Sequence, residues 1–318
     1  MRLFLGVDGG QSSTTALVGD GEGRVLGVGR AGPCNHAGTA EGRDKFTSAI
    51  SGSVRAALAE VGAPDGRFEV ACLGLSGGAA DKDILARQIV PAEKYFITHD
   101  ALIALAGATA GEPGVVAIAG TGSIAFGRSA DGRTARAGGW GYVFGDEGGA
   151  FDLVRQALRA ALRHEEGWGP ATAMRTALLE ATGAHDANDL LHRFYASEYP
   201  RARVASFARL VDDAARAGDV VARDILNWGA QALATLTGAV RRQLFPVGAR
   251  ARVSYAGGTF QSAMLLERYR MLVELEEGNC VAAPEYGSAA GALIEAYRAA
   301  NVKCTLKNVP EDILNKHE

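Results

Sequence analysis

The chain lacks several features that mark common protein classes. Its 33 Lys plus Arg do not outnumber its 36 Asp plus Glu, so no excess of positive charge is available to neutralise a nucleic-acid backbone. No apolar run approaches the roughly 18 residues of a membrane-spanning helix. The apolar stretch Leu3 to Val7 runs into Asp8 and lacks a cleavage site, unlike a signal peptide. We therefore expect neither a nucleic-acid partner nor a membrane partner.

Cysteine is also scarce, and its few positions are scattered. Cys34, Cys72, Cys280 and Cys304 form no C-x-x-C pair, which indicates free thiols in a reducing compartment and predicts a cytoplasmic protein. The six histidines show no H-E-x-x-H or similar spacing, so no zinc site is predicted. No glycine precedes a lysine, which excludes a Walker A loop.

Glycine, by contrast, is abundant at 42 of 318 residues, and many of the glycines lie in a repeated pattern. Short apolar runs predict strands over 3–7, 15–19 and 24–30, and the first two are joined by a Gly-rich turn. The same order returns over 115–119, 124–127 and 133–137, where Gly120 takes the place of Asp8. This repetition indicates an internal duplication at the scale of a domain, and at ~150 residues per domain the length also suggests two domains.

The remaining pattern alternates between strands and helices. Strands are expected at 70–75, 95–98, 252–256 and 280–283, and helices at 82–89, 101–110, 204–217, 220–244, 262–275 and 288–300. This alternation predicts the α/β class, with mostly parallel sheets covered by helices. From Asn301 the composition changes, since Lys303, Lys307 and Lys316 are three of only six lysines, and we expect this tail to lie outside the core.

The two Gly-rich turns are suited to holding phosphates. Successive backbone N–H groups in a tight turn form a concave anion site, and Ser or Thr hydroxyls add donors. Asp8 at the first turn could bind Mg²⁺ through its carboxylate. Each turn alone could be an ordinary hairpin, but two facing copies could clamp one triphosphate.

Two further positions have more than one interpretation. Asp100 ends a predicted strand and starts a helix, so it is either an N-cap or a carboxylate at the strand ends where ligands bind. Gly74 to Gly78 match the nucleophile elbow of hydrolases around Ser76, which would need Asp100 with His185 or His192 as triad partners. The hydrolase hypothesis does not explain the duplicated hairpins.

Taken together, four segments resemble the superfamily of actin, hexokinase and the heat-shock chaperone ATPases. They are Gly6 to Gly10, Gly120 to Ser123, Gly138 to Gly148 and Ala256 to Gly258. Within it, the sequence is most similar to the BadF/BadG-type ATPases and the N-acetylglucosamine kinases, over about residues 1 to 300. The Gly-Asp-Glu-Gly segment from Gly145, which follows Gly-Gly-Trp-Gly, is the most specific part.

The resemblance implies two actin/ribonuclease H-like domains, each with a βββαβα core, and a cleft between them for ATP and sugar. The N-terminal domain would comprise residues 1–112 with a returning helix at 288–300, the nucleotide-binding domain residues 113–287, and the tail residues 301–318. Ser12, Ser13 and Gly149 depart from the residues common in the family.

The family's functional positions carry over to matching residues of this chain. Asp100 would be the general base and Asp8 the Mg²⁺ ligand. The positions implied for ATP are Asp8, Gly9, Gly10, Gln11, Ser12, Thr14, Gly120, Thr121, Gly122, Ser123, Gly257 and Gly258. Those implied for the sugar are Asn35, Ser76, Gly77, Thr121, Trp140 and Asp146.

The main hypothesis is therefore an ATP- and Mg²⁺-dependent kinase, expected as a homodimer. It would phosphorylate a primary hydroxyl of an amino sugar, N-acetylglucosamine or glucosamine. Phosphoryl transfer needs neutralised phosphates and an oriented hydroxyl, which the two turns and Asp100 would supply. The alternative is a BadF-type ATPase that activates a partner enzyme through an Fe–S cluster, which needs closely placed cysteines.

Overall fold

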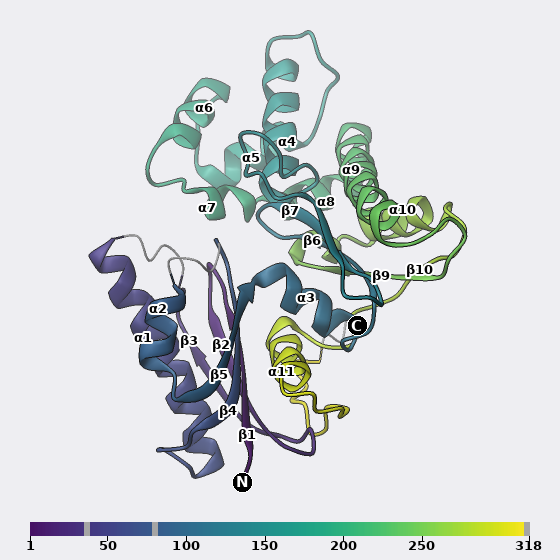
Figure 1. Cartoon of the computed structure of the whole chain (residues 1–318). Coiled ribbons are helices and arrows are strands. Elements are labelled where there is room, and N and C mark those ends of the chain that lie inside the picture. The colour runs from purple at the N-terminus through teal and green to yellow at the C-terminus, as the bar shows by residue number, and fades with distance from the viewer. Residues whose placement is uncertain (35–38, 78–81, 315–318) are drawn as a thin grey trace. The chain divides into compact units, whose positions relative to one another are not determined.

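The computed structural model describes residues 1–34, 39–77 and 82–314. The chain forms two compact units, one from Met1–Gly114 together with Ala283–Glu318 and one from Val115–Ala282. Each unit contains a five-stranded sheet with helices packed on it, so the expected α/β class is confirmed (Figure 1). The first unit is thus made from both ends of the chain, and the second is continuous in sequence.

The sheet of the first unit has the order β3-β2-β1-β4-β5. Strands β1 (Leu3–Gly9), β2 (Thr14–Asp20) and β3 (Val25–Ala31) form an antiparallel meander, while β4 (Phe68–Leu75) and β5 (Ala92–His99) run parallel to β1. In this register Asp8 pairs with Gly74, and Gly74 pairs with Thr98. The carboxyl ends of the three parallel strands therefore lie side by side.

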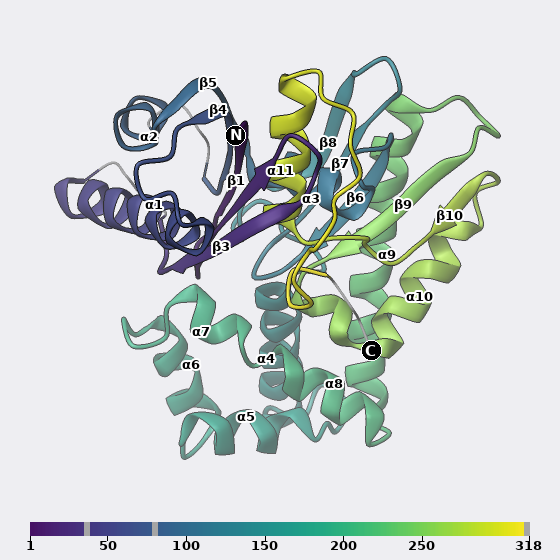
Figure 2. The ribbon, with the colours of Figure 1, turned by 90° about the horizontal axis from the view of Figure 1, so that it is seen from below.

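Helices cover both faces of this sheet. Helix α1 (Ala40–Val61) buries Phe46, Ile50, Val54 and Leu58, which recur at the four-residue spacing of one helical face. Thr39 caps its start by accepting the Gly42 N–H at 3.0 Å. Helices α3 (Asp100–Ala108) and α11 (Ser288–Ala299) pack on the opposite face, and the short α2 (Asp83–Ile89) lies beside α1 (Figure 2).

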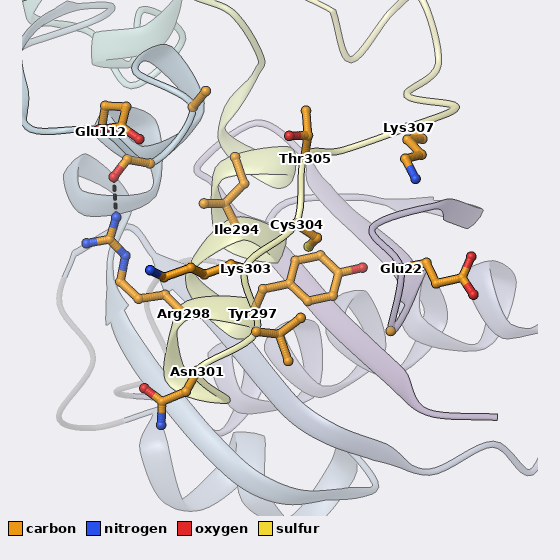
Figure 3. A pocket seen from close by; sticks show the side chains of 14 residues that line it. Glu22, Glu112, Ile294, Tyr297, Arg298, Asn301, Lys303, Cys304, Thr305 and Lys307 are labelled. Carbon is orange, nitrogen blue, oxygen red and sulfur yellow. Dashed lines mark hydrogen bonds between the residues drawn. The ribbon is translucent and has the colours of Figure 1, made fainter.

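The tail after α11 is part of the first unit, contrary to the expectation that it lies outside the core. Leu306 and Ile313 are buried in the cluster that contains Phe4 and Tyr297. The Val25 N–H donates to the Lys307 carbonyl at 2.9 Å, and the Lys307 N–H donates to the Gly23 carbonyl at 2.8 Å. Figure 3 shows the tail passing over α11, with Cys304 directed toward Tyr297. Lys303 and Lys307 are exposed, but the apolar Leu306 and Ile313 of the same segment are buried in the core of the first unit.

The second unit repeats the strand order of the first. Its sheet runs β10-β9-β6-β7-β8, from β6 (Gly114–Ala119), β7 (Ser123–Arg128), β8 (Thr134–Gly138), β9 (Ala251–Ala256) and β10 (Asn279–Val281). As in the first unit, the fourth and fifth strands run parallel to the first. Its helices include α4 (Ala150–Glu165), α9 (Val220–Leu244), a 3₁₀ turn η1 (Gly258–Gln261) and α10 (Ala263–Glu274). The duplication expected from sequence is therefore present in the topology.

A helical insertion between β8 and α9 contains the main departures from the expected elements. Helices α5 (Met174–Thr182) and α6 (Ala187–Tyr195) were not anticipated by the sequence pattern. The single helix expected over 204–217 is wrong, because α7 (Arg201–Ala205) and α8 (Ala208–Arg216) are separate. Phe207 is buried at the break, with its ring centroid 6.3 Å from that of Tyr199 and 6.2 Å from that of Phe194. This aromatic packing turns the chain where the apolar periodicity alone suggests continuity.

Candidate active site

The carboxyl ends of three neighbouring strands in the first unit bring together three polar side chains. Asp8 lies near the end of β1, Ser76 follows β4, and Asp100 follows β5. The Ser76 N–H donates to the Gly9 carbonyl at 3.0 Å, and the Ser76 hydroxyl donates to Asp100 Oδ2 at 2.8 Å. Ligands of open α/β sheets bind outside this edge. The fold thus places Ser76 between two carboxylates at a ligand-binding edge.

Asp100 is the first residue of α3 and not its N-cap. The cap is His99, whose Nδ1 accepts the Leu102 N–H at 3.2 Å. The Asp100 carboxylate accepts the Ala101 N–H at 2.9 Å on Oδ1 and the Ser76 hydroxyl on Oδ2, and the residue is exposed. The N-cap interpretation of Asp100 is therefore wrong, and its carboxylate is oriented while remaining accessible to a ligand.

Asp8 has different surroundings. Burial, and then the charge of Asp100, raises its pKa to about 7. Within the described ranges no cation or hydrogen-bond donor engages its carboxylate. Two carboxylates that converge without a counter-charge form an arrangement that a bound cation relieves, so the residues present fit a divalent ion such as Mg²⁺.

The first Gly-rich turn combines exposed and buried positions. Gln11 and Ser12 are exposed at its tip, where the Gly10 N–H donates to the Ser13 carbonyl at 2.9 Å. Thr14 is fully buried and donates its hydroxyl to the Gly32 carbonyl at 2.8 Å, so this side chain serves the turn itself. A Cβ at Gly9 would lie 2.7 Å from the Cys34 sulfur, which explains glycine there. Asn35 lies outside the described residues.

Ser76 makes none of the contacts of a hydrolase nucleophile. Its hydroxyl is bonded to a carboxylate, and within residues 1–34, 39–77 and 82–314 no histidine hydrogen bonds to it. Gly77 next to it is exposed at φ +74°. Sequence reasoning missed Lys82, which is only 2% exposed and donates to the Ser76 carbonyl. A lysine between two aspartates looks like a solvated residue, so no signal in the sequence distinguishes it.

The second Gly-rich turn, Gly120 to Ser123, belongs to the second unit and is fixed by the start of α4. The Ala150 N–H donates to the Gly120 carbonyl at 2.8 Å, and the Phe151 N–H donates to the Thr121 carbonyl at 3.1 Å. The Ser123 hydroxyl donates to the Glu147 carbonyl at 2.6 Å. These bonds fix the conformation of the turn.

Asp146 and Trp140 flank this turn in different ways. Asp146 is buried, adopts a left-handed backbone at φ +65°, accepts the Ser123 N–H at 3.3 Å and forms an ion pair with Arg201. Trp140 is 66% exposed, with the Arg136 guanidinium 5.2 Å from its ring centroid. The neighbouring Tyr142, Val143 and Phe144 are exposed as well. Trp140 can therefore contact a ligand directly, whereas the Asp146 carboxylate already has protein partners.

A cavity of about 600 Å³ adjoins the second turn within the second unit. Gly120, Thr121 and Gly258 line it, and Ala150, Ala205 and Leu226 are among its apolar wall residues. Gly257 adopts φ +101°, and a side chain there would collide with the Ala119 carbonyl. The second turn and the Gly257-Gly258 turn thus border one cavity.

The cysteines do not form a metal site in this structure. Cys34 and Cys72 are buried, while Cys304 is half-buried and Cys280 is exposed. Among the described residues no three His, Cys, Asp or Glu side chains are grouped so that they could hold a metal ion. The described part of one chain therefore contains no ready ligand set for the Fe–S cluster of the activator hypothesis.

Two five-stranded units with one strand order, each with a Gly-rich turn after its first strand, form a two-domain fold of the actin and hexokinase type. The model of the BadF/BadG/BcrA/BcrD ATPase family matches residues 5–296. The chain belongs to this family.

Relatives with assigned activities cover most of the chain. An N-acetylmuramic acid/N-acetylglucosamine kinase of Clostridium acetobutylicum is 30% identical over 281 residues, which are 86% of this chain and 91% of that protein. An N-acetyl-D-glucosamine kinase of Dictyostelium discoideum is 31% identical over 258 residues, or 76% of this chain and 80% of that protein.

Solved structures share the fold. A Chromobacterium violaceum protein provisionally named N-acetylglucosamine kinase has a TM-score of 0.77 at 26% identity, covering 92% of this chain and 98% of its own. A ROK family glucokinase from Streptomyces griseus, in complex with glucose and AMPPNP, has a TM-score of 0.56 at 19% identity. The match covers 94% of this chain and 99% of that glucokinase chain, so the fold is shared along nearly the whole length of both.

Proposed function

We propose that this protein is an ATP-dependent amino-sugar kinase that phosphorylates a primary hydroxyl of N-acetylglucosamine or glucosamine. The observation that carries the proposal is the convergence of Asp8, Ser76 and Asp100 at the carboxyl ends of β1, β4 and β5. The activities of the two relatives at about 30% identity support the same substrate class. N-acetylmuramic acid, which the Clostridium relative's name includes, belongs in the same set of test substrates.

In this proposal Asp100 is the general base. Its carboxylate is exposed and its Oδ2 is fixed by Ser76, so a sugar hydroxyl can reach it in a defined orientation. The carboxylate accepts the hydroxyl proton as the oxygen attacks the γ-phosphorus, and ADP leaves. Gly77 and Trp140 are proposed to contact the sugar ring, and Asp146 is proposed to act through its contacts with the second turn.

The nucleotide is proposed to use the two turns and the cavity of the second unit. Backbone N–H groups of the first turn and of Gly120 to Ser123 would bind phosphate oxygens, and the cavity beside Gly258 would take the nucleoside. Mg²⁺, when bound, would neutralise phosphate charge. Asp8 would hold it, because its carboxylate has no cation partner among the described residues.

The cellular compartment and the oligomeric state complete the proposal. An ATP-consuming enzyme with free cysteines fits the cytoplasm, where both ATP and reducing conditions are available. Across the part of the chain that the structure describes, no helix is both long and apolar enough to cross a bilayer. A homodimer stays a prediction, which light scattering of the purified chain tests.

A substrate panel tests the proposed function. The purified full chain is incubated with ATP, Mg²⁺ and N-acetylglucosamine, glucosamine, N-acetylmuramic acid or glucose, and ADP release and product mass are measured. We expect a sugar mass increased by one phosphate group for at least one amino sugar, with weaker activity on glucose. ADP release that no sugar stimulates would contradict the kinase proposal and favour an ATPase with another partner.

A further inference from the structure

Arg201, the first residue of α7, contacts three functional segments of the second unit at once. Its guanidinium forms an ion pair with Asp146, and it lies 5.3 Å from the Tyr142 ring centroid and 6.0 Å from that of Phe151. Tyr142 belongs to the exposed loop that begins at Trp140, and Phe151 opens α4. Neither sequence motifs nor the family resemblance singles out this arginine.

The ion pair lies directly against the second Gly-rich turn. A side chain at Gly122 would collide with both the Asp146 carboxylate and the Arg201 guanidinium. Asp146 also accepts the Ser123 N–H, so one carboxylate joins Arg201 to the turn. Its left-handed backbone is unfavourable for a residue with a side chain, and it persists because these contacts fix it.

The same helix forms a wall of the proposed nucleotide cavity. Ala202 and Ala205, which follow Arg201 in α7, line the cavity together with Gly120 and Thr121. A nucleoside in the cavity would therefore contact the helix that begins with Arg201. The Arg201 Nε is buried without a hydrogen-bond partner among the described residues, so the guanidinium is held by one carboxylate and two rings alone.

We propose that Arg201 is a positioning residue that couples nucleotide binding to sugar binding. A nucleoside against α7 restricts Arg201, and Arg201 in turn restricts Asp146 and the Trp140–Phe144 loop on the sugar side. Each ligand then binds more tightly when the other is present, because the first has already ordered the shared contacts. This inference rests on the proposed kinase function and adds to it the link between its two substrates.

Calorimetry of sugar binding with and without nucleotide tests the coupling. The probes are N-acetylglucosamine, or the panel sugar phosphorylated fastest, and the non-hydrolysable analogue AMP-PNP with Mg²⁺. For the unmodified chain we expect the sugar Kd to fall at least ~5-fold when AMP-PNP is present. For Arg201→Gln the coupling ratio, which is the sugar Kd without nucleotide divided by the sugar Kd with AMP-PNP, falls below ~2. The sugar Kd without nucleotide changes less than ~3-fold. A merely structural arginine would change stability and leave the ratio intact.

Arg203→Gln is the matched control. Arg203 lies in the same helix but stacks on Tyr199 at 4.1 Å and donates to the Glu198 carbonyl, away from Asp146 and the turn. It should keep the full ratio. A double-mutant cycle adds specificity, because Arg201→Gln should change the ratio little further in the background of Asp146→Asn.

The possible outcomes distinguish failure of the proposed coupling through Arg201 from failure of the proposed kinase function. A wild-type ratio in Arg201→Gln overturns the inference, and so does an unmodified chain that binds both ligands without mutual effect, although the kinase proposal then stands. Binding of neither ligand to the unmodified chain contradicts the kinase proposal itself. If Arg201→Gln does not fold, Arg201→Lys decides, since it keeps the charge but lacks the planar guanidinium. A lowered ratio in that variant supports the coupling and a full ratio overturns it.

Discussion

Asp8 and Asp100 lie at the ends of strands of one sheet, but their surroundings differ, and we propose different roles for them. Asp100 is exposed and oriented by Ser76, whereas Asp8 is half-buried and has no hydrogen-bond donor or cation as a partner in the part of the chain that the structure describes. The first arrangement suits a group that exchanges a proton with a substrate. The second arrangement suits a carboxylate that binds a cation. Substitutions that preserve shape and remove charge distinguish the two roles.

Asp100→Asn should reduce kcat by ~10²–10⁴, because the amide keeps the hydrogen bond from Ser76 but cannot accept the hydroxyl proton. The thermal midpoint should change little, since His99 and not Asp100 caps α3. Steady-state rates at saturating sugar and ATP, with a thermal melt of the same sample, measure both quantities. A variant with kcat near that of the unmodified chain would exclude Asp100 as the base.

Asp8→Asn should stabilise the protein without ligands while reducing its use of Mg·ATP. The pKa of Asp8 in the folded state is raised to about 7 by burial and by Asp100, above its ordinary value of 3.8. At pH 3 the carboxyl is protonated in both the folded and the unfolded state and has no effect. As the pH rises from about 4 to 7, the unfolded state releases the proton more readily, so the unmodified chain loses stability that the asparagine variant keeps.

The expected gain for Asp8→Asn at pH 8 is of order 1–3 kcal/mol in the free energy of unfolding, and it should vanish near pH 4. Chemical denaturation at both pH values, in buffer with a chelator, measures it. With Mg·ATP present the ranking should reverse, because the unmodified chain gains binding energy that the variant lacks. Equal stability of the two proteins at pH 8 would mean that the Asp8 carboxylate is not in an unfavourable environment.

At the scale of elements, the hydrophobic patterns predicted most of what the structure shows. The strands of both meanders and the helices α9, α10 and α11 follow from apolar spacing and Gly-rich turns that agree with the tertiary packing. The break between α7 and α8 does not follow from apolar spacing, because burial of Phe207 against Tyr199 and Phe194 overrides local periodicity. Lys82 and Arg201 were not predicted either, since their importance depends on contacts between residues far apart in sequence.

The tail after α11 offers a test of packing at this scale. Leu306→Ala should reduce the free energy of unfolding by roughly 2–4 kcal/mol, because Leu306 is buried in the cluster with Phe4 and Tyr297 and its loss leaves a cavity. Lys303→Ala, at an exposed position of the same segment, is the control and should have little effect. Denaturant unfolding compares the two. Similar stability of both variants would mean that the tail does not contribute to the core of the first unit.

At the scale of the whole molecule, the second unit is continuous and carries its own core and the proposed nucleotide cavity. A chain that ends after Ala282 should therefore keep residues 115–282 folded and lose the first unit, which lacks α11 and the tail in that variant. Hydrogen exchange should show protected amides in 115–282 and rapid exchange in β1 to β5. Full protection of both units in the truncated chain would show that α11 is dispensable.

The split first unit also constrains how the protein is made. A ribosome synthesises residues 1–114 first, but the partners of Phe4 and Leu17 on α11 and the tail follow only after the whole second unit. The second unit can complete its sheet as soon as residues 115–282 have emerged, while the strands of the first unit lack part of their core until α11 and the tail have emerged. Domains usually fold in the order of synthesis. Here the order of completion is reversed, because the unit that bears Asp8 and Asp100 can complete its core only after α11 and the residues that follow it have been synthesised.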